Sequence, residues 1–178
     1  PDGGKVMAFV GLGDQANAVE RYQGLKEAVA GTKIEIIDLR TDEVDFGKAR
    51  RNAEDTLTKY PDIAGMVGLW SYNGPLILEA VKDKGVLDKV KIIAFDEDPR
   101  TLKAIDKGEI FATVAQKPYQ FGYQSVKALR DLIVENKTAQ DLGVPETKQK
   151  FIETIIIRKG EGEAYLEKCN ARKASTKK

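Results

Sequence analysis

The sequence predicts an α/β fold: a doubly wound, mainly parallel sheet with helices on both faces. Short apolar runs with β-rich composition alternate along the chain with amphipathic stretches of helical period. The runs are nearly continuous in apolar residues, which is typical of strands that are buried on both sides. Regular alternation of strands and helices favours a parallel sheet covered by its connecting helices.

Capping residues, prolines and glycines mark the ends of the expected helices and so separate them from the strands. Asp45 can cap the second helix, and Pro75 and Pro99 stand at first helical positions, where a missing N–H costs little. Glycines follow three helices, at positions 31, 85 and 108. The expected strands are 6–11, 33–39, 65–70, 90–95 and 110–116, and the helices between them are 16–30, 47–60, 74–84 and 99–107.

The C-terminal third of the chain has a different pattern. A longer helix is expected at about 118–136, beginning at Pro118, followed by a polar loop at about 137–150. A last strand is expected at Phe151–Arg158. The tail Lys168–Lys178 is basic and poor in apolar residues, which predicts a frayed terminus.

Composition limits the classes of function. The chain has 178 residues, 42% apolar and 32% charged, with a net charge of +1, so it is predicted to be globular and to lack a field that attracts nucleic acid. One cysteine, Cys169, and no histidine exclude an internal disulfide and the usual zinc site, and we expect no cofactor. No run approaches the ~18 apolar residues of a membrane span. Pro1–Gly4 is linker-like and no signal peptide precedes Lys5, so we expect a truncated or processed chain.

Polar and aromatic residues follow the ends of the predicted strands. Ligands of open parallel sheets bind beyond the carboxyl ends of the strands, so these residues are expected on one rim. Local structure explains some of them: Asp98 is suited to cap a helix, and Thr41 or Asp42 to shape a turn. In chain order the rim residues are Leu12–Gln15, Asp38, Arg40–Asp42, Trp70–Asn73, Asp96–Asp98 and Gln116.

A dinucleotide site is one alternative interpretation, and it makes an NAD-binding oxidoreductase domain one candidate function. Gly11–Ala16 matches a relaxed Gly-x-Gly-x-x-Ala pattern, Asp38 ends the second strand, and Tyr123 stands four residues before Lys127. However, Asp14 would lie beside the pyrophosphate and repel it. Spacing of four is also common by chance in an amphipathic helix, and no Gly-Lys-Ser/Thr phosphate loop is present.

A cleft for a polar small molecule is the favoured interpretation. A sugar presents hydroxyls at its edge and C–H patches on its faces, so it requires fixed polar groups and an aromatic ring. Trp70 could equally be a core residue, and Arg21 a solvated helix charge. The residues expected to bond hydroxyls are Arg21, Asn73, Asp96 and Gln116, and the ring expected to cover a face is that of Trp70 or Tyr72.

Several motifs occur in a characteristic order: Glu20-Arg21-x-x-Gly24, Tyr60-Pro61-Asp62-Ile63, Phe95-Asp96 and Ala112-Thr113-Val114-Ala115-Gln116-x-Pro118. Their order resembles a periplasmic sugar-binding protein of the ribose-binding type, over roughly Gly3 to Arg158. Such proteins are substrate-binding components of ABC transporters, and the effector domains of LacI-type regulators share their fold. The resemblance implies a two-lobed protein that closes on a monosaccharide or related polyol by hinge bending, with this chain as one lobe of the type I periplasmic binding protein fold and strand order 2-1-3-4-5.

The resemblance also implies the organisation of the chain and its partners. Relatives have a further N-terminal lobe before the equivalent of Gly3, so this chain is expected to be the C-terminal part. The implied division is a ligand-binding lobe at 1–116, a hinge-crossing helix and returning strand at 117–160, and a basic tail at 161–178. The implied partners are a sugar, the membrane permease and the missing lobe, with no nucleic acid. The implied location is periplasmic or extracytoplasmic, with or without a lipid anchor, and no enzyme activity is expected. A LacI-type effector domain, which needs a helix-turn-helix upstream, stays open.

Individual ligand residues follow from the same resemblance. Arg21 matches the sugar-binding arginine, Asp96 the acidic acceptor with Phe95 beside it, and Gln116 the glutamine before the hinge. The loop at Trp70–Asn73 departs from the family pattern, so either Asn73 or Trp70 stands for the usual asparagine. The aromatic position after the second strand falls on Phe46, with Val44 and Asp45 as alternatives. The full expected set is Leu12, Arg21, Phe46, Trp70, Tyr72, Asn73, Phe95, Asp96 and Gln116.

Overall fold

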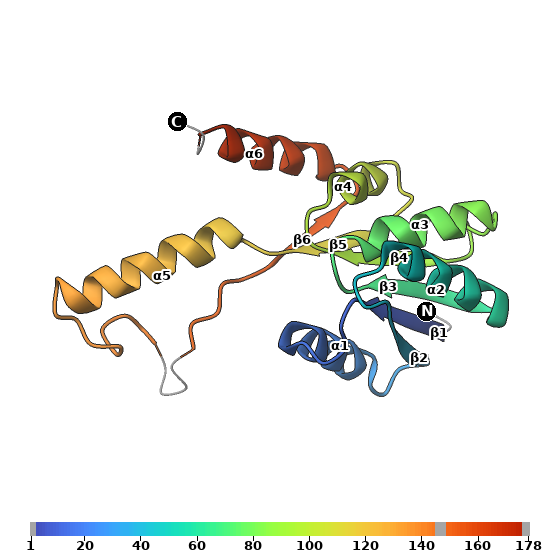
Figure 1. The fold of residues 1–178 in the computed structure, drawn as a ribbon, viewed down its shortest axis with the longest axis horizontal. Coiled ribbons are helices and arrows are strands. Elements are labelled where there is room, and N and C mark those ends of the chain that lie inside the picture. The colour runs from blue at the N-terminus through green and yellow to red at the C-terminus, as the bar shows by residue number, and fades with distance from the viewer. Residues whose placement is uncertain (1–2, 145–148, 176–178) are drawn as a thin grey trace. The chain divides into compact units, whose positions relative to one another are not determined.

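Strands and helices alternate along the chain as predicted (Figure 1). The structure, a computed structural model, describes residues 3–144 and 149–175; residues 1 and 2 of the predicted linker, 145–148 of the predicted loop and 176–178 of the tail lie outside the described residues. The elements are β1 (Gly4–Val10), α1 (Ala16–Val29), β2 (Ile34–Thr41), α2 (Phe46–Lys59), β3 (Ile63–Gly68), α3 (Asn73–Asp83), β4 (Lys91–Phe95), α4 (Pro99–Asp106), β5 (Ala112–Ala115), α5 (Pro118–Ile133), β6 (Ile155–Arg158) and α6 (Gly162–Ser175).

The strands form one sheet in the order β2-β1-β3-β4-β5-β6. β1 pairs in parallel with β2 and β3, and the pairs β3–β4 and β4–β5 are parallel too. The predicted α/β fold, parallel sheet and strand order 2-1-3-4-5 are therefore confirmed. All the loops at the carboxyl ends of β1 to β4 consequently lie at one edge of the sheet.

Alternate side chains of β1 point to opposite faces of the sheet. Met7 and Phe9 are buried in a core cluster with residues of α2, α3 and α4, whereas Ala8 and Val10 pack in a second cluster with α1. In Figure 1, α1 lies below the sheet and α3 and α4 lie above it. Burial on both faces explains why the strands read as continuous apolar runs instead of alternating ones.

The predicted helix boundaries have the expected chemistry, with one difference. The Asp45 and Asp98 carboxylates accept backbone N–H groups at the starts of α2 and α4, at 2.7 and 2.8 Å. The glycines at 31, 85 and 108 have φ of +74°, +70° and +76°. However, α3 begins at Asn73, so Pro75 is its third residue instead of its first. The first four N–H groups of a helix have no partner within the helix, so proline fits there as well.

The C-terminal tail forms a helix, which corrects the expectation of a frayed terminus. α6 packs against α4. The Asp106 carboxylate at the end of α4 accepts the backbone N–H groups of Gly160, Gly162 and Glu163 at 2.9, 3.0 and 2.7 Å. A Cβ at Gly162 would lie 2.3 Å from the Leu102 carbonyl oxygen, so only glycine permits this approach. The capping group comes from a distant part of the sequence, and local composition could not reveal it.

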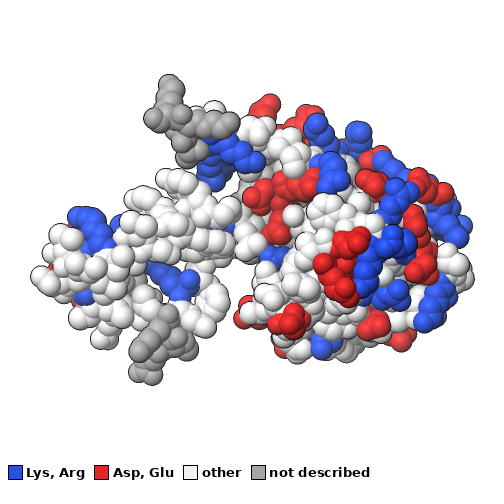
Figure 2. All heavy atoms as spheres, viewed as in Figure 1, with Lys and Arg blue, Asp and Glu red and all other residues white. Residues whose placement is uncertain are grey.

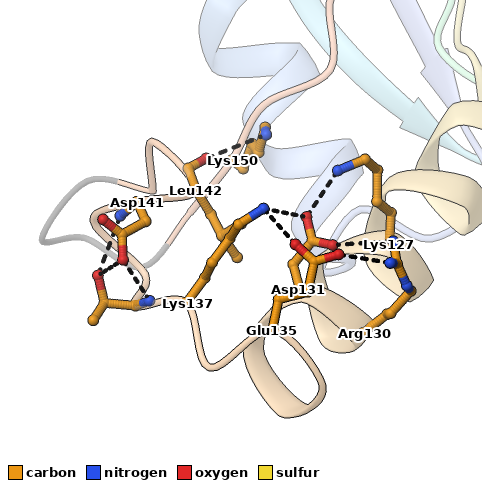
Figure 3. A network of polar contacts seen from close by, with 9 residues as sticks. Lys127, Arg130, Asp131, Glu135, Lys137, Asp141, Leu142 and Lys150 are labelled. Atoms are coloured by element: carbon orange, nitrogen blue, oxygen red, sulfur yellow. Dashed lines mark hydrogen bonds and ion pairs between the residues drawn. The ribbon is translucent and has the colours of Figure 1, made fainter.

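The chain divides into two compact units: Pro1–Val114 with Ile156–Lys178, and Ala115–Ile155. In the second unit, α5 begins at Pro118 as predicted and ends at Ile133. Near its C-terminal end the Asp131 carboxylate, which is 2% exposed, accepts the Lys127 ammonium at 2.8 Å (Figure 3). Glu135 joins this network through Arg130 at 2.6 Å and Lys137 at 2.7 Å. This network fixes the turn that ends α5. After the loop, the last strand, β6, starts at Ile155, which is later than the predicted start at Phe151.

α5 exposes a large apolar surface. Tyr119 and Tyr123 are 53% and 52% exposed with their rings stacked 6.1 Å apart, and Val126 is 69% exposed. The part of the molecule that contains α5 is largely free of charged side chains in the view of Figure 2, whereas acidic and basic residues are interspersed over the first unit. Among the helices in the described ranges, none has the length and apolar character needed to span a bilayer.

Candidate functional site

Two oppositely charged side chains from distant parts of the chain meet at the carboxyl edge of the sheet. Nη2 of Arg21, in the second turn of α1, lies 3.4 Å from Oδ1 of Asp96, which directly follows β4. The two side chains are 12% and 22% exposed. Arg21 and Asp96, predicted separately as ligand residues, therefore share one partly exposed site.

The guanidinium of Arg21 is held from two further sides. Its Nη1 donates to the backbone carbonyl of Leu69 at 2.5 Å. Its Cζ lies 4.8 Å from the centre of the Phe95 ring, in cation–π contact. A planar guanidinium with five N–H groups can make these contacts and still direct other N–H groups elsewhere, which an ammonium group cannot do with the same geometry. The cation is thus fixed in place by protein contacts alone.

Asp96 has an uncommon backbone conformation. Its φ is +67°, in the left-handed region that non-glycine residues seldom adopt. Its N–H donates to the carbonyl of Val114 at 2.9 Å, and its own carbonyl accepts the Thr113 hydroxyl at 2.8 Å. Such a conformation costs about 1–3 kcal/mol and persists only where the surroundings impose it. Here β5 imposes it and so directs the carboxylate toward Arg21.

The residue after Asp96 connects the site to α6. Glu97 is partly buried, and its pKa is raised first by burial and then by the charge of Asp96, with Lys173 acting in the opposite direction. The pKa of Cys169 is raised by burial and then by Glu97. Glu97 and two residues of α6, Cys169 and Lys173, therefore influence one another electrostatically. The sequence-based prediction missed this relationship because it treated the tail as unstructured.

Three aromatic rings form a group beside the charged pair. Phe46, at the start of α2, is 57% exposed, and its ring lies 4.7 Å from that of Tyr72. Trp70 meets Tyr72 edge-on at 6.4 Å. Trp70 also packs into the cluster that contains Phe95, which joins the aromatic group to the charged pair. The structure therefore groups Phe46 with Trp70 and Tyr72, which were predicted from a different segment.

Two of the predicted ligand residues are buried and bonded to other protein groups. Asn73 is 1% exposed; its Oδ1 accepts the Trp70 N–H at 3.1 Å, and its Nδ2 donates to Asp42 Oδ2 at 2.9 Å. Tyr72 is 9% exposed and donates its hydroxyl to Asp42 Oδ1 at 2.5 Å. The pKa of Tyr72 is raised strongly, first by burial and then by Asp42. This differs from the expectation that both face a ligand, because each side chain is committed to Asp42.

The remaining predicted residues are at the ends of the first and fifth strands. Leu12 is partly buried in the loop after β1. Gln116 follows β5 and belongs to the second unit, so the structure does not relate it to the Arg21–Asp96 pair. In the described residues no three acidic, cysteine or histidine side chains gather as a metal-binding group would require.

The features that favoured a dinucleotide site have structural explanations. A Cβ at Gly11 would lie 2.1 Å from a carbon of the Trp70 ring and 2.7 Å from the Tyr72 hydroxyl, so this glycine makes room for the aromatic group. The Asp38 carboxylate accepts the N–H of its neighbour Leu39 at 2.8 Å. In the second unit, Lys127 pairs with Asp131. Close packing and local bonding therefore account for the pattern.

Comparison with known proteins matches most of this chain to one family. A sequence profile described as "Periplasmic binding protein domain" matches residues 1–137. The ribose import binding protein of Escherichia coli (strain K12) is 30% identical over 145 residues, which are 79% of this chain and 49% of that protein. The D-allose-binding periplasmic protein of the same strain is 26% identical over 157 residues, 88% of this chain and 50% of that protein. The chain thus spans about half the length of the curated relatives it matches.

Solved structures give the same picture. A glucose-galactose binding protein from Geobacillus stearothermophilus is 30% identical with a TM-score of 0.78, over 88% of this chain and 54% of that one. The sugar-binding protein of a sugar ABC transporter from Bacillus halodurans is 29% identical with a TM-score of 0.78, over 92% of this chain and 58% of that one. A periplasmic solute-binding protein from Actinobacillus succinogenes, solved with bound D-allose, is 19% identical and shares the fold, with a TM-score of 0.79 over 92% of this chain and 56% of that one.

Proposed function

This chain belongs to the periplasmic binding protein domain family, and we propose that it is the sugar-binding C-terminal lobe of a solute-binding protein that serves an ABC transporter. Its ligand in this proposal is a monosaccharide or a related polyol. The names of the ribose, allose and glucose-galactose binding relatives support this ligand class. The protein binds and presents the sugar without transforming it, and it acts outside the cytoplasmic membrane.

The observation that carries the proposal is the Arg21–Asp96 pair above the Phe95 ring. The pair offers a cationic donor and an anionic acceptor within 3.4 Å of each other, at a partly exposed edge. Neighbouring hydroxyls of a sugar both donate and accept hydrogen bonds, and bonds to ionised groups are stronger than neutral ones. Phe46, 57% exposed, adds a ring that can cover an apolar sugar face. In the proposal, Arg21, Asp96, Phe46, Phe95, Trp70, Leu12 and Gln116 contact the sugar, while Tyr72 and Asn73 support them.

The proposal includes a second lobe of the same protein as a partner. The exposed apolar face of α5 forms a groove of 610 Å³ that includes Tyr119, Tyr123 and Val126. Apolar side chains that are exposed along a helix indicate a surface that another protein part covers. Residues 1–116 then form the lobe, 117–160 the hinge-crossing helix and returning strand, and 161–178 the C-terminal extension. A membrane permease receives the closed protein.

A sugar panel tests the proposed function directly. The protein in its natural length should gain thermal stability with at least one of D-ribose, D-allose, D-galactose, D-glucose or L-arabinose, because a ligand that binds the native state stabilises it. At about 100 times Kd the gain is about 2.7 kcal/mol. NAD serves as the control and should give no shift. No response to any sugar at millimolar concentration, or a response to NAD alone, would contradict the proposal.

A further inference from the structure

Asp42 is a buried carboxylate that the ligand-binding prediction did not use. It is 0% exposed and directly follows β2. Oδ1 accepts the Tyr72 hydroxyl at 2.5 Å and the Val44 N–H at 2.9 Å, and Oδ2 accepts the Asn73 side-chain amide at 2.9 Å. A bond to Val44, two residues on, is the turn-shaping role that the sequence suggested. The other two bonds reach across to the loop after β3.

Each of these two bonds controls a different part of the aromatic group. The Tyr72 ring, anchored through its hydroxyl, lies under the exposed Phe46 ring at 4.7 Å. Asn73, anchored through Nδ2, turns its Oδ1 to the backbone N–H of Trp70 at 3.1 Å. The next carbonyl back along the chain, that of Leu69, accepts Nη1 of Arg21. One carboxylate therefore underlies both the aromatic surface and the segment that holds the arginine.

We propose that Asp42 is a positioning residue for sugar recognition, which acts through Tyr72 and Asn73 to fix the Phe46 and Trp70 rings against the ligand. The inference rests on the proposed function of this edge of the sheet. Asp42 does not contact the sugar. It sets the ring positions that decide which sugar face fits.

The bonding pattern requires an acceptor at both oxygens of Asp42. An amide at this position keeps one acceptor, but it turns a donor toward Nδ2 of Asn73, which is also a donor. Exchanging the two residue types restores every bond: the introduced amide at 42 donates to the introduced carboxylate at 73, whose second oxygen accepts the Trp70 N–H. The exchange also keeps one negative charge in the buried network.

The test compares sugar affinities of the natural-length protein, using the sugar from the panel that binds most tightly. Asp42→Asn should weaken binding about tenfold or more, since mismatched buried donors displace the loop. The double variant Asp42→Asn with Asn73→Asp should bind the sugar within about threefold of the parent's affinity, because the exchanged amide and carboxylate can pair again. Asp38→Asn is the matched control, because Asp38 is exposed on β2, four residues before Asp42, and its carboxylate accepts the N–H of its neighbour Leu39. The sugar affinity of this variant should equal that of the parent.

Affinity is measured at a temperature where each variant is folded by circular dichroism, so a purely structural role does not change the result. If Asp42→Asn fails to fold, Tyr72→Phe removes only the hydroxyl and should still weaken binding severalfold. Unchanged affinity in a folded Asp42→Asn or Tyr72→Phe variant overturns the inference, as does a double variant no better than Asp42→Asn. A parent that binds no sugar overturns the proposed function itself, and the inference with it.

Discussion

Nη1 of Arg21 donates to the backbone carbonyl of Leu69 at 2.5 Å, so a helix side chain is tied to the segment that follows β3. The same guanidinium reaches Asp96 at 3.4 Å and stacks on Phe95. A charged group already fixed in its binding geometry loses little conformational entropy when a ligand arrives. The site is therefore organised before binding, and its dependence on Arg21 can be measured.

Replacing Arg21 by lysine tests this organisation. Arg21→Lys keeps the positive charge, but it removes the planar guanidinium that bonds to both the Leu69 carbonyl and the Asp96 carboxylate and that stacks on Phe95. We expect sugar affinity, measured by calorimetry on the natural-length protein, to fall about ten- to a hundredfold, the effect of unmatched polar groups in a partly buried site. Arg51→Lys on the exposed surface of α2 is the control. If Arg21→Lys bound the sugar as tightly as the parent, the proposed role of the Arg21 guanidinium in sugar binding would be wrong.

Gly11 and Gly24 give opposite predictions for the same substitution. Gly11→Ala drives a methyl group to 2.1 Å from the Trp70 ring, and such overpacking costs about 1–3 kcal/mol of unfolding free energy. Gly24 lies inside α1, and apart from its chain neighbours and the helix's own backbone no atom lies within 4 Å of a methyl group added there. Gly24→Ala should therefore stabilise the protein by about 0.5–1 kcal/mol. Denaturant unfolding of both variants checks the pair. Similar effects in both variants would mean that Gly11 is not a close-packing position.

Asp106 predicts an acid-sensitive attachment of α6. Burial raises the pKa of Asp106, but the hydrogen bonds from the N–H groups of Gly162, Glu163 and Gly160 together lower it by more. The pKa of Asp106 therefore lies below the ordinary value. A carboxyl whose folded pKa is depressed stabilises the fold above its unfolded pKa of about 3.9, and this stabilisation is lost as the pH falls through the folded pKa.

Melting temperatures of the parent and of Asp106→Asn, measured from pH 6 down to pH 2, check this prediction. The variant should melt lower at pH 6, and the difference should shrink toward pH 2 as the parent's carboxylate is protonated. A difference that stays constant over this range would show that the charge of Asp106 contributes nothing.

The apolar face of α5 predicts a context-dependent mutation. Val126 is 69% exposed, so Val126→Asp has little to disrupt within the described chain. If α5 packs against a second lobe, the same change buries an unpaired charge there and should lower the stability of the natural-length protein by more than about 2 kcal/mol. Thermal unfolding of that protein measures it. An effect below about 0.5 kcal/mol would mean that this face stays exposed.

Most of the fold was predictable because its signals are local. The continuous apolar runs of β1 and β3, the caps at Asp45 and Asp98, and the positive-φ glycines can each be recognised within a few residues of sequence. α6 was missed because its capping group, Asp106, lies more than fifty residues away. A short basic segment on its own carries no sign of the carboxylate that receives it.

The candidate site divides in the same way. Arg21, Phe95 and Asp96 could be predicted together because the strand order brings the ends of β1 and β4 to one edge. Asn73 was predicted to bond a sugar and Trp70 or Tyr72 to cover a sugar face, but sequence cannot show that the buried Asp42 engages both Asn73 and Tyr72. Which polar groups at a strand end turn inward depends on partners in other loops, and that information exists only in three dimensions.

The backbone of Asp96 restricts how this site can diversify. At φ +67° glycine is the least strained residue, asparagine and aspartate adopt the conformation more readily than other side chains, and β-branched side chains are strongly disfavoured. We therefore expect few residue types to be accepted at position 96, whichever sugar binds. New preferences among hydroxylated compounds then have to arise at neighbours such as Phe46, the first residue of α2, which is not among the residues with a positive φ. A change of sugar preference would then alter the residues around Asp96 and leave Asp96 itself in place.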